Sequence, residues 1–150
     1  MRLGMEQVGF QCKVLYRDND VVKVRISGWN GTFGGAADVY IGAGQLSEIA
    51  LRLRGFPGNG ADVREVMLGT FDSESAGGGV RMKFYCVSAA GHCRVEAKIA
   101  ADPGPAGSSE CAVLVLPIEA SAVDLFVEAL DQLDKATLTE AFLRGAAAAS

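Results

Sequence analysis

The sequence predicts an α+β fold in which a largely antiparallel sheet of about seven strands carries two helices packed on it. The expected order along the chain is three strands, a helix, four strands and a second helix. Alternating apolar and polar residues recur over most of the chain, and only two segments repeat apolar residues at helical spacing. Because strands follow one another without intervening helices, hairpin connections dominate and the pattern excludes a doubly wound parallel sheet.

Length and charge limit the class of protein. The 150 residues predict a single domain spanning residues 1–150, with a frayed tail from about residue 145. Fourteen Lys and Arg against 18 Asp and Glu give a formal charge of −4, which argues against binding to a nucleic acid backbone. The most apolar run, residues 112–118, is too short to span a bilayer, and the first ten residues lack a signal-peptide core. We therefore expect a cytoplasmic protein with no membrane partner.

Three strands are expected first. Strict alternation predicts a hairpin whose arms flank a turn at residues 17–20. Its apolar face consists of Phe10, Cys12, Val14, Tyr16, Val22, Val24 and Ile26. A third strand is expected over residues 32–41, with Gly34 and Gly35 marking a bulge or a bend.

The first helix is delimited on both sides. Apolar residues at helical spacing are Leu46, Ile49, Ala50 and Leu53. Gly55 and Pro57 follow and stop the helix, and Phe56 between them is expected to return to the core.

Four strands are expected next, at residues 64–71, 80–87, 93–100 and 112–118. The middle two form a hairpin whose register is set by three cross-strand pairs. These pairs are Phe84 with Val95, Met82 with Ala97, and Lys83 with Glu96. In residues 112–118 both the even-numbered and the odd-numbered side chains are apolar, which predicts a central strand covered on both faces.

The second helix is expected to begin at Ser121, which with Asp124 has the spacing of a capping box. Its apolar stripe consists of Val123, Phe126, Val127, Leu130 and Leu133. The same stripe extends through Thr137 to Ala141, so the helix is expected to continue that far or to be capped again at Thr137.

The four cysteines fall on the apolar parity of their strands, which predicts buried thiols at Cys12, Cys86, Cys93 and Cys111. Cys86 and Cys93 lie opposite each other in the expected register, so a disulfide between them remains open. Zinc knuckle spacing is missing, and we expect no metal. No cofactor is expected either, because Gly42 and Gly44 lie outside the parallel strand–helix–strand unit that a dinucleotide-binding turn requires.

A carboxylate-containing pocket is one functional hypothesis. Asp72 and Glu74 lie beside the glycine run at residues 77–79, and Tyr40 or His92 could join them. His92 is expected at a hairpin turn, on the opposite strand face from Cys93, so the two do not form a catalytic dyad. This hypothesis gives a small-molecule-binding protein or a hydrolase.

An acidic stripe on the last helix supports a second hypothesis. Asp124, Glu128 and Asp131 recur at helical spacing, with Asp134 adjacent. Like charges at these spacings destabilise a helix by a few tenths of a kcal/mol each unless a cation offsets them. A basic protein partner would supply that offset, whereas a solvated helix face needs none.

Four segments carry a resemblance. Trp29, Gly31 and Phe33, followed by residues 38–41, 45–50 and 55–57, resemble a group of small uncharacterised bacterial proteins. In size, acidity and α+β pattern the chain is similar to immunity proteins, which bind and neutralise toxins in the bacterial cytoplasm. This resemblance implies a non-enzymatic protein-binding module with a basic toxin as partner, and it transfers no catalytic residue.

Overall fold

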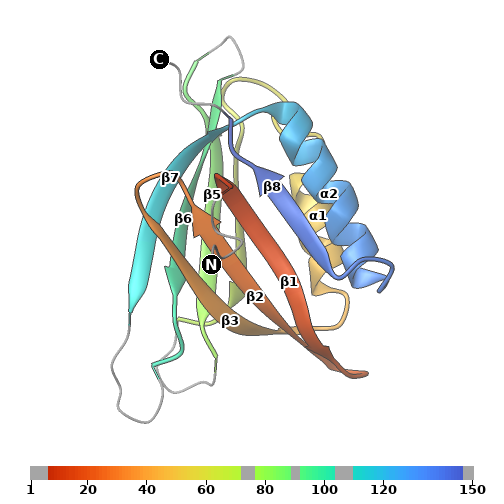
Figure 1. Ribbon diagram of the computed structural model, residues 1–150. Coiled ribbons are helices and arrows are strands. Elements are labelled where there is room, and N and C mark those ends of the chain that lie inside the picture. Colours follow the sequence, from red (N-terminus) through yellow and green to blue (C-terminus); the bar gives the residue numbers. More distant parts are fainter. Residues whose placement is uncertain (1–6, 72–76, 89–91, 104–109, 147–150) are drawn as a thin grey trace.

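A computed structural model describes residues 7–71, 77–88, 92–103 and 110–146 (Figure 1). Within these ranges the chain forms eight strands and two helices. The first half consists of β1 (Gly9–Arg17), β2 (Val21–Trp29), β3 (Gly34–Gly42), α1 (Gln45–Leu53) and β4 (Val63–Gly69). The second half consists of β5 (Gly79–Cys86), β6 (Cys93–Ala100), β7 (Cys111–Ile118), α2 (Ala120–Asp134) and β8 (Glu140–Arg144).

The strands form two antiparallel sheets of four, so the α+β class is confirmed and the expected seven-stranded sheet is wrong. The first sheet has the order β3-β2-β1-β8 and the second has the order β4-β5-β6-β7. β3 contacts every strand of the second sheet, and Figure 1 shows it running across them. Away from β3 the sheets separate, and the helices fill that space, with α2 against β8 and α1 against β4.

The hairpin registers follow the expected side-chain pairing. In β5 and β6, Phe84 pairs with Val95 and Lys83 pairs with Glu96, as expected. The hairpin of β1 and β2 is also confirmed, but its register shifts between Val14 and Tyr16. This irregularity turns Tyr16 outward with 56% of its surface exposed, so its expected place in the core is wrong.

Glycines allow the turn from β3 into α1. β2 and β3 pair in continuous register through Gly34 and Gly35, so the bulge expected there is absent. Gly44, at the N-terminus of α1, has φ of +88°, a conformation that glycine adopts without strain. The expected buried stripe of α1 is confirmed, and the ring of Phe56 packs edge-on against Phe84 at a centroid distance of 5.8 Å.

α2 begins at Ala120, after Glu119 at the N-cap position, and has no side-chain cap, so the capping box expected at Ser121 is wrong. Its apolar stripe is buried as expected. The helix ends at Asp134, and Ala136 then adopts φ of +64°, which reverses the chain. The extension of the helix to Ala141 is therefore wrong, and residues 140–144 form β8 against β1 instead.

β7 is an edge strand and not a central one. Leu114, Leu116 and Ile118 on one face of β7 are buried, whereas Val113 and Val115 on the other face are 56% and 38% exposed. Pro117 fits this position because an edge strand tolerates a residue without a backbone N–H.

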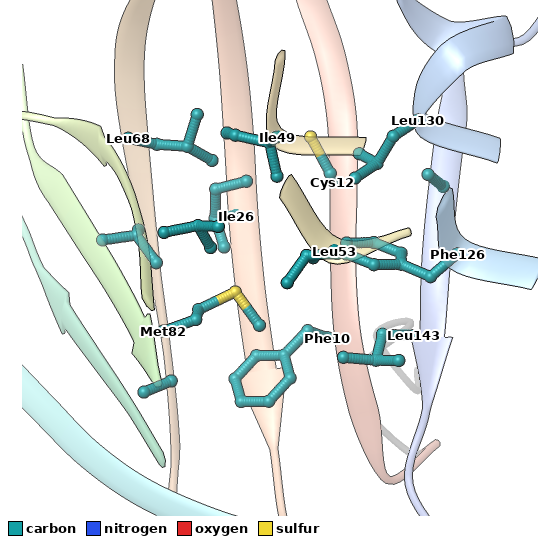
Figure 2. Packing of buried hydrophobic residues seen from close by; sticks show 14 of the residues in the cluster. Phe10, Cys12, Ile26, Ile49, Leu53, Leu68, Met82, Phe126, Leu130 and Leu143 are labelled. Carbon is teal, nitrogen blue, oxygen red and sulfur yellow. The ribbon is translucent and has the colours of Figure 1, made fainter. Parts of the chain in front are cut away.

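The core lies between the two sheets and under both helices (Figure 2). Phe10, Cys12 and Ile26 of the first sheet face Leu68 and Met82 of the second sheet. The labelled helix residues between them are Ile49, Leu53, Phe126 and Leu130. A residual void of about 20 Å³ within this core is lined by apolar side chains apart from Gln11, and it is far smaller than a ligand pocket of ~300 Å³ or more.

Candidate binding surfaces

The acidic stripe on α2 lies beside α1, so part of it contacts the protein and the rest is exposed to solvent. Arg54, which follows α1, places Nη1 3.0 Å from Oε1 of Glu128 and Nη2 2.7 Å from Oδ2 of Asp131. The Oγ of Ser47 donates a hydrogen bond of 2.9 Å to Oδ2 of Asp134. Asp124, one turn before Glu128, is exposed. The chain itself therefore provides the cation that the charge spacing requires for Glu128 and Asp131.

A cation also lies at the end of α2. Arg17 of β1 donates hydrogen bonds of 2.6 Å to the carbonyl oxygen of Leu133 and 3.1 Å to that of Asp134. These carbonyls belong to the last turn of the helix, where positive charge is favourable. Arg17 and Arg54 together anchor the acidic helix to β1 and α1.

The residues of the expected carboxylate pocket do not all meet. Tyr40 lies beside Gly77, where a Cβ would contact its ring. His92 is exposed beyond the opposite end of β5, and this strand of eight residues spans about 25 Å. Asp72 and Glu74 lie outside the described residues. The structure thus brings Tyr40 to the glycine run and separates His92 from it.

A shallow depression of about 360 Å³ surrounds Tyr40. Its polar lining is already paired: Arg25 donates to both carboxylate oxygens of Asp38, at 2.8 and 3.2 Å. Oδ2 of Asp102 accepts a hydrogen bond of 3.0 Å from the backbone N–H of Gly77, and the ammonium of Lys23 lies 5.6 Å from the ring centroid of Tyr40. These groups stabilise one another and leave fewer hydrogen-bonding positions for a ligand.

A wider depression of about 480 Å³ lies where α2 begins and β8 ends. Leu125, 72% exposed, and the half-buried Phe142 give it an apolar side, and Glu119 and Arg144 give it opposite charges. The sequence did not indicate this hollow, because it depends on β8, which was not expected as a strand.

The outer side of the second sheet carries both exposed apolar and charged side chains. We call it the β4–β7 face. It comprises Val63, Glu65, Met67, Arg81, Lys83, Tyr85, Arg94, Glu96, Lys98, Val113, Val115 and Pro117. Apolar residues occupy its two edge strands, where Val63, Met67 and Val113 are 56%, 47% and 56% exposed.

Charged residues occupy the middle of this face. The four cations of β5 and β6 outnumber the two carboxylates, so the β4–β7 face carries a formal charge of +2 within a chain of −4. Two of these cations stack on one aromatic ring, since Arg81 and Lys98 lie 5.3 and 5.1 Å from the ring centroid of Phe71. Sequence reasoning missed this face because apolar residues on both parities of β7 were interpreted as burial on both sides.

The cysteines differ in their surroundings. Cys12 and Cys93 are buried as expected, Cys86 is half-buried, and Cys111 is exposed, so its expected burial is wrong. Burial raises the pKa of the Cys12 thiol to about 12. Among the described residues, no group of three or more His, Cys, Asp or Glu side chains is placed to hold a metal ion.

Neither helix within the described ranges combines the length and apolar character needed to cross a lipid bilayer. Comparisons of the chain with models of protein families, with curated proteins and with solved structures found no match.

Proposed function

We propose that the protein is a non-enzymatic binding module that docks a protein partner on the β4–β7 face. The observation that carries the proposal is the exposure of Val63, Met67, Val113 and Val115 on the two edge strands of one sheet. Scattered exposed apolar side chains are ordinary, but here several lie on one face of one sheet, on both sides of a charged centre, which favours an interaction surface.

The charge of this face indicates the chemistry of the partner. Cations at the centre of a face favour an acidic surface, and the apolar edge strands favour aliphatic or aromatic side chains on either side of it. This differs from the basic partner that the stripe of Asp124, Glu128, Asp131 and Asp134 suggested. Arg54 offsets only one of the four negative charges of that stripe, so the choice of the β4–β7 face depends on its exposed apolar side chains and not on a larger charge.

An immunity protein that binds and neutralises a toxin is the most concrete form of this proposal. Its support is the length and the α+β pattern. In this form the partner is a toxin whose docked surface is blocked, and the protein needs no catalytic group of its own.

The test uses two double variants that reverse charge on opposite surfaces. Lys83→Glu with Arg94→Glu alters the β4–β7 face, and Asp124→Lys with Glu128→Lys alters α2. Each is used as bait for partner capture from the native host, followed by measurement of the affinity of the captured protein at low and high salt. Circular dichroism confirms that each variant is folded.

Loss of binding in the first variant alone supports the β4–β7 face, with an affinity that decreases as salt screens the interaction. Loss in the second variant alone would move the interface to α2 and restore a basic partner. Binding that survives both variants would contradict a charge-guided interface on either surface.

The alternative function is a small-molecule-binding protein or a hydrolase, and the adjacency of Tyr40 and Gly77 in a depression favours it. NMR titration with a fragment library tests it. Shift changes confined to Lys23, Tyr40 and Gly77 would support this alternative, and changes elsewhere or none would oppose it.

A further inference from the structure

Cys86 and Cys93 face each other where the β5–β6 hairpin opens toward its loop. They are direct partners in the ladder, and their Sγ atoms lie 3.2 Å apart. The backbone N–H of Val87 donates to the carbonyl oxygen of His92 at 2.8 Å, so the adjacent Cys86–Cys93 pair is of the non-hydrogen-bonded kind. The Cα atoms of such pairs lie about 4.5 Å apart, at the lower end of the range that a disulfide bridges.

The two thiols differ in access to solvent. Cys93 has 2% of its surface exposed, whereas Cys86 is half-buried, with Sγ 3.8 Å from the carbonyl oxygen of Asn59. Burial, together with the hydrogen bond to Cys86, raises the pKa of Cys93 to about 12. Cys93 is therefore protonated at neutral pH, and a dissolved reagent reaches Cys86 first.

We propose that Cys86 and Cys93 form a reversible oxidation site that closes into a disulfide by exchange with a small-molecule disulfide such as oxidised glutathione. The Cys86 thiolate attacks one sulfur of the reagent, its S–S bond breaks, and one reagent thiolate leaves. Cys93 then attacks Sγ of Cys86 and expels the second reagent molecule as its thiol, which takes up the proton lost by Cys93. Two protein thiols are oxidised and one reagent disulfide is reduced to two thiols.

Proximity separates this pair from the other cysteines. Cys111 is exposed, so it can form a mixed disulfide with the reagent, but it lies on β7 opposite Ala100 and has no cysteine paired with it. Cys12 is buried in the core on β1. The bond between Cys86 and Cys93 joins the ends of β5 and β6 next to Tyr85 and Arg94, which belong to the β4–β7 face.

Peptide mapping tests the site on the wild-type protein. Cleavage after Lys83 and Arg94 releases residues 84–94, which contain both cysteines, whereas Cys12 and Cys111 fall in separate peptides, 3–13 and 99–135. The folded protein is treated with oxidised glutathione, remaining thiols are alkylated after unfolding, and the digest is analysed by mass spectrometry. We expect peptide 84–94 to lose two hydrogens and to carry no alkyl group, and thiol reductant to reverse this.

Two outcomes would overturn the proposal. One is peptide 84–94 alkylated at both cysteines under conditions that convert Cys111 to its glutathione mixed disulfide. The other is a glutathione adduct on Cys86 that persists without transfer to Cys93.

Variants supply the matched comparison. Cys86→Ser is expected to remove the internal bond and to leave Cys93 unmodified, whereas Cys111→Ser leaves the bond unchanged. The oxidised wild type should unfold several degrees above the reduced form, because the bond restricts the unfolded chain, and Cys86→Ser should show no such shift. If mapping confirms the bond but the oxidised and reduced wild-type proteins unfold at the same midpoint, the bond does not fit the native pairing of β5 and β6, and the proposal is contradicted.

Discussion

Nη2 of Arg54 lies 2.7 Å from Oδ2 of Asp131, so an ion pair joins the end of α1 to the last turn of α2. The same guanidinium reaches Glu128, and both contacts raise the pKa of Arg54 above its ordinary value. The pair connects two helices that are far apart in sequence and that share a buried apolar interface. It also explains why like charges are tolerated at this spacing on α2.

The first prediction concerns this ion pair. Arg54→Gln should lower the unfolding midpoint slightly, because the carboxylates of Glu128 and Asp131 then repel each other without a cation between them. Thermal unfolding in low and high salt measures it, and the difference from wild type should shrink as salt screens the charges. Arg52→Gln, in the last turn of α1, is the control. Equal effects of the two substitutions would contradict the pairing.

The second prediction concerns packing under α2. Leu130 is 2% exposed and lines the small apolar void, whereas Leu125 on the same helix is 72% exposed. Leu130→Ala should reduce the free energy of unfolding by about 3–4 kcal/mol, because it enlarges the void. Leu125→Ala should change it by less than ~0.5 kcal/mol. Urea unfolding of both variants measures this difference, and similar losses would contradict the assigned burial.

Local patterns in the sequence predict local pairing well. The β5–β6 register follows from matching apolar and charged residues across a short loop, as Phe84 opposite Val95 shows. The stripes of α1 and α2 follow from helical spacing alone. In each case the residues that decide the structure are close together in sequence.

Pairing between distant segments could not be read in the same way. β8 pairs with β1, and its Ala141 lies opposite Cys12, 129 positions earlier. Thr137 and Ala141 continue the spacing of the α2 stripe, so nothing local separates a short strand from one more helical turn. The division into two sheets depends on these distant contacts. Alternation of apolar and polar residues shows which face of a strand is buried, but it does not show which sheet the strand joins.

The candidate surfaces were predictable to different degrees. Glu128 and Asp131 follow directly from helical spacing, but their neighbour Arg54 lies in the segment after α1, where spacing gives no orientation. The β4–β7 face was missed because Val113 and Val115 resemble core residues in sequence. Pro117 was the available signal, since proline favours an edge strand.

The third prediction concerns a close backbone approach. Gly69 ends β4 with φ of +70°, and a Cβ there would collide with the carbonyl oxygen of Gly78 and approach Val39 to 3.0 Å. Gly69→Ala should therefore destabilise the protein by about 2–4 kcal/mol, from the unfavourable backbone conformation and the collision together. Gly42→Ala is the control, because a Cβ at Gly42 would meet nothing within 4 Å. Equal unfolding midpoints for the two variants would contradict this placement.

The last prediction concerns acid sensitivity at Asp62, which follows α1 and precedes β4. The hydrogen bonds from the Arg64 guanidinium, one of them 2.8 Å long, and from the Gly58 N–H at 2.7 Å lower the pKa of Asp62 below its ordinary value. Between the folded and unfolded pKa values the unfolded chain binds more protons, so stability rises with pH in that interval. The contribution is complete above the ordinary aspartate pKa of ~3.9 and is lost as the pH falls through the folded value.

Asp62→Asn should thus destabilise the protein at neutral pH and approach wild type in acid, as urea unfolding over a pH series would measure. Arg64→Lys retains the charge without the paired N–H groups, so the stability of this variant should depend on pH less steeply than that of the wild type and more steeply than that of Asp62→Asn. A constant difference in stability between Asp62→Asn and wild type at every pH would show that the carboxylate charge is not the cause.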